Sequence, residues 1–95
     1  MTLTDLRTKR NLILALASQY GARNVRVFGS VASGRSEQAS DVDLLVEMTE
    51  ERSLFDRIAL KQDLEDLLGS SVDLVTDKGL HRVIKEKVLA EAVPL

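Results

Sequence analysis

Two aspartates near the middle of the chain are the residues best suited to catalytic chemistry. Asp41 and Asp43 are separated by one residue and open an apolar run typical of a β-strand. Side chains at positions i and i+2 of a strand point to the same face, about 7 Å apart at about 3.3 Å per residue. Two carboxylates placed in this way suit a pair of divalent metal ions about 4 Å apart. We therefore expect Asp41 and Asp43 to hold metal ions.

A glycine–serine pair precedes these aspartates, with ten residues in between. Gly29 and Ser30 directly follow another apolar run, residues 24–28. A glycine turn lets backbone N–H groups approach phosphate oxygens, and a serine hydroxyl adds a further donor. The combination predicts metal-dependent chemistry on a nucleoside triphosphate. Taken alone, each pair has a simpler interpretation, an ordinary turn for Gly29 and Ser30 and polar strand-entry residues for Asp41 and Asp43.

A third acidic residue lies inside the last predicted strand, residues 72–76. Asp73 stands between Val72 and Leu74, whose side chains are expected to point into the core. Its carboxylate therefore points to the opposite face of the sheet. The alternative role is an edge-strand charge that discourages aggregation.

The remaining elements follow from capping and periodicity. Thr4 can cap a first helix that runs to about Tyr20 and ends at Gly21, and Ser53 with Asp56 three residues later is typical of a capping box. That second long helix runs to residue 68 and ends at Gly69. The apolar stripe of a last helix, ending before Pro94, is formed by Leu80, Ile84 and Val88.

Alternating helices and strands predict an α/β domain, in which helices flank a small sheet. The expected order is helix, strand, short helix, strand, helix, strand, helix, with strands at residues 24–28, 42–47 and 72–76 and a short helical turn plus loop within residues 29–40. That connection is too short for a full crossover helix, so it permits antiparallel pairing of the first two strands. We expect a single domain over residues 1–95.

The segments VRVFGS, SDVDLLVE and SVDLVT together resemble the nucleotidyltransferase superfamily that includes DNA polymerase beta, and within it the minimal nucleotidyltransferases (MNT proteins) of prokaryotes. The resemblance covers nearly the whole chain. It implies a mixed sheet, ATP as substrate and two Mg²⁺ ions. It also implies that Asp73 completes the metal site formed with Asp41 and Asp43, and takes the proton from the attacking hydroxyl.

The resemblance also marks one departure. Family members often carry a basic residue immediately before the glycine at position 34, where this chain has Ser33. Arg35 follows that glycine and is our candidate for the missing phosphate contact. The departure puts efficient catalysis in doubt more than nucleotide binding.

MNT proteins are typically paired with an all-helical HEPN toxin. The resemblance therefore implies an antitoxin that transfers AMP from ATP to a hydroxyl, with a tyrosine of the HEPN partner as the expected acceptor, within an oligomeric complex. Two alternatives stay open. One is an antitoxin that acts by binding alone. The other is a small-molecule transferase of the antibiotic-modifying type, which needs an additional substrate-binding domain or a dimeric partner.

Composition excludes several classes of protein and kinds of site. Hydrophobic residues make up 44% and charged residues 29%, as in ordinary globular chains. A net charge of −2 gives no reason to expect direct nucleic-acid binding, and the lack of cysteine excludes disulfides and thiolate metal sites. His81 stands alone and is expected to be an exposed helix residue. No apolar run reaches the length of about 18 residues typical of a membrane span, and we expect a cytoplasmic protein.

Overall fold

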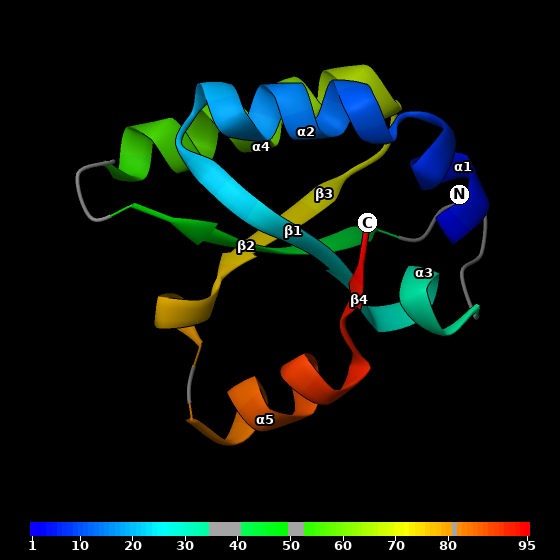
Figure 1. The fold of residues 1–95 in the computed structure, drawn as a ribbon, viewed down its shortest axis with the longest axis vertical. Helices are drawn as coiled ribbons and strands as arrows, with labels where there is room; N and C mark the ends of the chain where they lie inside the picture. Colours follow the sequence, from blue (N-terminus) through cyan, green and yellow to red (C-terminus); the bar gives the residue numbers. More distant parts are fainter. Residues whose placement is uncertain (35–40, 50–52, 81) are drawn as a thin grey trace.

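The computed structural model describes residues 1–34, 41–49, 53–80 and 82–95. Figure 1 shows a small twisted sheet with helices on both of its faces. The strands are β1 (Ala22–Phe28), β2 (Val42–Met48), β3 (Val72–Thr76) and β4 (Val93–Pro94). The helices are α1 (Leu3–Thr8), α2 (Arg10–Gln19), α3 (Gly29–Ser33), α4 (Leu54–Leu68) and α5 (Arg82–Glu91), with a 3₁₀ turn η1 (Asp77–Gly79).

The sheet is mixed, as predicted, and its strand order is β3-β2-β1-β4. Strand β2 pairs antiparallel with β1 and parallel with β3, while β4 pairs antiparallel with β1. The pairing places Phe28 opposite Asp43 and Asp43 opposite Asp73. Three neighbouring strands therefore bring these residues into one row across the sheet.

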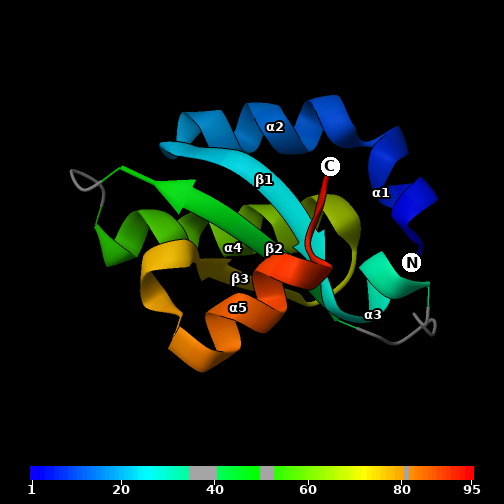
Figure 2. The same ribbon diagram turned by 60° about the horizontal axis from the view of Figure 1, so that its bottom comes forward.

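The main core lies between the sheet and the helices α2 and α4, which cover the same face (Figure 1). The predicted inward side chains Val42, Leu44 and Val46 of β2 are at most 1% exposed there. Helix α5 lies on the opposite face (Figure 2). On that side Leu45 and Val88 are also buried, outside the main cluster. The face that carries the aspartates is therefore partly covered.

The amino-terminal helix differs from the prediction. Thr2, not Thr4, is the cap, since Thr2 N–H donates to Asp5 Oδ2 at 3.0 Å and Asp5 N–H donates to Thr2 Oγ1 at 3.1 Å. Asp5 is three residues beyond Thr2, whereas the residue three beyond Thr4 is Arg7, which cannot accept. The helix also breaks at Lys9, giving α1 and α2 in place of one helix.

The carboxyl-terminal part differs as well. Leu80 has an extended backbone (φ −85°, ψ 133°), so the last helix begins two residues later than the predicted stripe. Val88 is buried as expected, but Ile84 is 54% exposed. Strand β4 was not predicted. It lies at the sheet edge, where proline is tolerated because its missing N–H breaks no central ladder.

Other local predictions are confirmed. Strand β3 has the predicted bounds, while β1 and β2 each include the predicted strand and extend beyond it. Ser53 N–H donates to Asp56 Oδ2 at 3.0 Å in the capping box that opens α4, and the helix ends at Gly69 with φ of 66°. Arg35 and His81 lie outside the described residues. Within the described ranges, every helix is too short or too polar to span a membrane.

Candidate active site

The site lies where β1 ends and where β2 and β3 begin. Gly29 follows directly on β1, Asp43 is the second residue of β2, and Asp73 is the second residue of β3. Val42 and Leu44 point into the core from either side of Asp43, and Val72 and Leu74 do the same around Asp73. Both carboxylates therefore project from the opposite face of the sheet. Their two strands are parallel neighbours, about 4.8 Å apart. Asp41 immediately precedes β2 and is exposed.

Asp43 has an environment that opposes its negative charge. Its residue is half-buried, whereas Asp41 and Asp73 are exposed. Partial burial raises the pKa of Asp43, and the negative charges of Asp73 and Asp41 raise that pKa further. The structure thus brings Asp41 and Asp73 close enough for their charges to act on Asp43. A bound cation would therefore stabilise the ionised carboxylate of Asp43 more than that of an exposed acid.

Gly29 lies directly against Asp43. Its φ of +71° belongs to the left-handed region that favours glycine. A Cβ added at this position would lie 3.1 Å from Cγ of Asp43 and closer still to Oδ2. The glycine is therefore required both by the backbone and by the space that the carboxylate fills. The sequence predicted an open approach for phosphate at this position, and the structure adds the contact with Asp43.

Ser30 lies in the first turn of α3, the short helix predicted after the glycine. Phe28 is the residue before that helix and provides no side-chain cap to it. Ser33 Oγ donates to the backbone oxygen of Ser30 at 3.2 Å, so the side chain that replaces the usual basic residue bonds within α3. Arg35, the candidate substitute, cannot be placed because it falls outside the described part of the chain.

The acids suit Mg²⁺ by their chemistry, because hard divalent cations take carboxylate oxygens. Within the described residues, no three acidic or histidine side chains lie close enough together to hold a metal ion by themselves. Mg²⁺ is commonly bound by one or two carboxylates together with substrate phosphates and water. The half-buried Asp43 with an acidic neighbour therefore fits a metal that arrives with a nucleotide, and the assignment of the three ligands stays a prediction.

Sequence reasoning missed one residue on this face. Arg26 lies on β1 opposite Leu45 of β2, two residues along the ladder from the pair formed by Phe28 and Asp43. Its Nε is buried and makes no hydrogen bond in the described part of the protein. The signal was available, because Arg26 is the one charged residue in the apolar segment VRVF.

A mixed sheet with a Gly-Ser turn against one strand carboxylate, and a second carboxylate opposite it, is the arrangement expected of a nucleotidyltransferase. The sequence agrees, since residues 9–95 match the family model described as "Nucleotidyltransferase domain". The chain belongs to this family, and within it to the minimal nucleotidyltransferases.

Three known proteins show how close the similarity is. Protein adenylyltransferase MntA of Thermococcus cleftensis is 44% identical over 78 residues, which are 82% of this chain and 79% of the relative. A solved structure described as a candidate minimal nucleotidyltransferase superposes with a TM-score of 0.90 at 49% identity, covering 100% of this chain and 97% of the other. A toxin–antitoxin crystal structure with AMP-PNP matches with a TM-score of 0.77 at 27% identity, covering 88% of this chain and 69% of the other.

Proposed function

We propose that this protein is a protein adenylyltransferase that transfers AMP from ATP to a hydroxyl group of a toxin and thereby acts as its antitoxin. The observation that carries the proposal is the placement of Gly29 against Asp43, with Asp73 opposite Asp43 on the next strand, because it combines an approach for phosphate with candidate acidic metal ligands. The relative named protein adenylyltransferase MntA and the toxin–antitoxin structure with AMP-PNP support the choice of nucleotide and of partner.

The chain's own groups have separate tasks in this proposal. The backbone N–H groups at Gly29 and Ser30 and the Ser30 hydroxyl bind phosphate oxygens, and Arg35 is a further candidate contact. Asp41, Asp43 and Asp73 would hold two Mg²⁺ ions, which neutralise charge on the transferred phosphoryl group. Asp73 accepts the proton of the attacking hydroxyl. A bond forms between that oxygen and the α-phosphorus, and the bond to pyrophosphate breaks.

The exposure of Asp41 and Asp73 supports a macromolecular acceptor. A site at the surface provides no walls that would orient a small acceptor or exclude water from it. A docked protein supplies both, so we propose that residues 1–95 work as one minimal domain in complex with a HEPN-type toxin. The acceptor is then a tyrosine hydroxyl of the toxin, modified in the cytoplasm, where ATP is available.

One observation favours a second candidate, an antitoxin that acts by binding alone. Ser33 stands where family members often have a basic residue, and its hydroxyl bonds to Ser30 within α3. A missing cation beside the phosphates weakens catalysis more than it weakens a protein–protein contact.

The two candidates separate in one experiment. The co-encoded toxin is incubated with this protein, ATP and Mg²⁺, and its intact mass is measured, with Asp43→Asn as the test variant and Asp66→Asn, an exposed acid of α4, as the control. We expect AMP adducts on the toxin with wild type and the control, and none with Asp43→Asn. Protection of cells without any adduct would support the antitoxin that acts by binding alone.

A further inference from the structure

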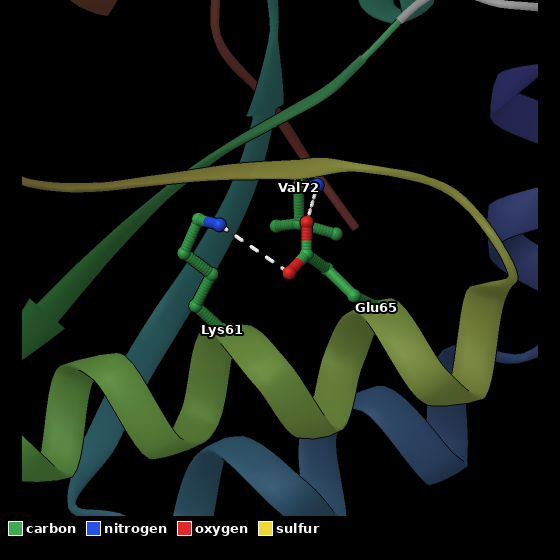
Figure 3. A network of polar contacts seen from close by, with 3 residues as sticks. All are labelled: Lys61, Glu65 and Val72. Carbon is green, nitrogen blue, oxygen red and sulfur yellow. Dashed lines mark hydrogen bonds and ion pairs between the residues drawn. The ribbon is translucent and has the colours of Figure 1, made fainter.

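A carboxylate on α4 is bound to the strand that carries Asp73. Glu65 Oε2 accepts a hydrogen bond from the backbone N–H of Val72 at 3.0 Å, and Glu65 Oε1 lies 3.3 Å from Lys61 Nζ. Figure 3 shows both contacts, with the Glu65 side chain reaching from the helix to the strand. Val72 is the first residue of β3 and immediately precedes Asp73.

The N–H group of Val72 is one that the sheet itself does not use. The backbone oxygen of Ser71, the residue before β3, accepts from Val42 N–H at 2.9 Å, so this oxygen points toward β2. The backbone N–H and C=O groups of successive residues point alternately to the two edges of a strand. The N–H of Val72 therefore points away from β2. Strand β3 is at the edge of the sheet, with β2 as its neighbour on one side. Glu65 therefore binds the free edge of β3 at the position before Asp73.

The hydrogen bond from Val72 to Glu65 lies beside a pair of like charges that disfavours the pairing of β2 with β3. Asp73 stands opposite Asp43 on the neighbouring strand, and their like charges repel. An edge strand is held by one ladder only, so repulsion at its first residues favours fraying. A hydrogen bond from Val72 to a helix that is packed on the sheet opposes that movement.

Glu65 is otherwise badly placed for stability. It lies in the carboxyl-terminal part of α4, where the helix dipole disfavours a negative charge. The Val72 N–H and then Lys61 offset this effect, and they lower the pKa of Glu65, so the carboxylate stays ionised at neutral pH. An ionised acceptor makes a stronger hydrogen bond to the strand than a neutral one.

We propose that Glu65 is a positioning residue, which holds the first residue of β3 so that Asp73 stays beside Asp43 for metal and nucleotide binding. The inference deepens the proposed function and rests on it only through the metal-binding role of Asp73. It assigns no chemical step to Glu65 itself.

The test uses two readouts. In the metal-free protein, NMR amide exchange reports on the Val72 N–H, and calorimetry with Mg²⁺ and AMP-PNP reports on the site. We expect Glu65→Ala to speed exchange at Val72 and to weaken Mg²⁺–AMP-PNP binding about tenfold, the size of effect typical of residues that orient metal ligands. Glu65→Gln keeps an acceptor oxygen and restores most of both signals. Asp66→Ala, the exposed neighbour on the same helix, changes neither.

The decisive comparison is made in an Asp73→Asn background. If Glu65 acts through Asp73, Glu65→Ala weakens nucleotide binding no further once Asp73 has lost its charge. A folded Glu65→Ala protein with wild-type affinity overturns the proposal, and so does an equal further loss in the Asp73→Asn background. Failure of the wild type to adenylylate a toxin would refute the proposed function instead, because affinity and Val72 exchange are measured without a toxin.

Discussion

Gly29 and Asp43 are in such close contact that no side chain fits at position 29 unless the carboxylate of Asp43 moves. A side chain at position 29 would meet the Asp43 carboxylate, with Cβ only 3.1 Å from Cγ. The turn expected to admit phosphate therefore also makes room for the central acid. The effect of substitution at Gly29 should exceed that of backbone strain alone.

We predict that Gly29→Ala weakens Mg²⁺–AMP-PNP binding by at least tenfold in a protein that still folds. Positive φ costs a residue with Cβ about 1 kcal/mol, and the displaced carboxylate adds the loss of a metal ligand. Gly69→Ala is the matched control, because Gly69 has φ of +66° and open space around a Cβ. Calorimetry and thermal unfolding of both variants check the prediction. Equal binding losses in the two would mean that backbone strain, not the contact with Asp43, is responsible.

The raised pKa of Asp43 predicts a pH dependence of stability. The folded protein binds this proton more tightly than the unfolded chain, so ionisation of Asp43 lowers the free energy of unfolding. The destabilisation is absent below the ordinary value of 3.8 and complete above the raised pKa of the folded state. Metal-free Asp43→Asn should therefore be more stable than wild type at pH 7, by a margin that shrinks as the pH falls through this window. Urea unfolding at several pH values measures it, and a margin independent of pH would contradict the prediction.

Asp73→Asn should lower AMP transfer at least a hundredfold while the fold survives. The amide can neither accept the proton from the attacking hydroxyl nor bind a metal ion as a carboxylate does, and general base catalysis alone contributes about 10²–10⁴-fold. Single-turnover adenylylation of the toxin, followed by mass spectrometry, gives the rate. Asp77→Asn, an acid of the 3₁₀ turn beyond β3, serves as the control. A variant with normal turnover would remove Asp73 from the site.

Arg26→Met should stabilise the free protein by about 1 kcal/mol, because an unsatisfied buried polar group costs about 1–3 kcal/mol. Methionine replaces the apolar stem of the arginine and removes the buried Nε that makes no hydrogen bond among the described residues. Arg23→Met is the control on the same strand. Its side chain is 78% exposed and its Nε lies 3.5 Å from Glu47 Oε2, so it should change stability little. Thermal unfolding of the two variants decides, and a destabilised Arg26→Met would show that the guanidinium is satisfied in solution.

Local signals in the sequence were sufficient for several parts of this protein. The capping pair Ser53 and Asp56, the stop at Gly69 and the alternation around Asp73 each depend on residues within a few positions of one another. The spacing between the Gly-Ser pair and the aspartates, flanked by apolar runs, indicated a nucleotidyltransferase, and the family match agrees. The roles of the individual acids stay predictions.

Contacts between distant segments required the tertiary structure. The pairing of Asp43 with Asp73, the contact of Gly29 with Asp43 and the bond from Glu65 to Val72 depend on register and helix packing, which no local pattern encodes. The same holds for β4, whose two residues become a strand only because β1 offers a free edge. Periodicity of the side chains determines which face a residue occupies within its own element. The packing of one element on another determines which residues then meet, and this is why the sequence indicated the acids while only the fold placed them together.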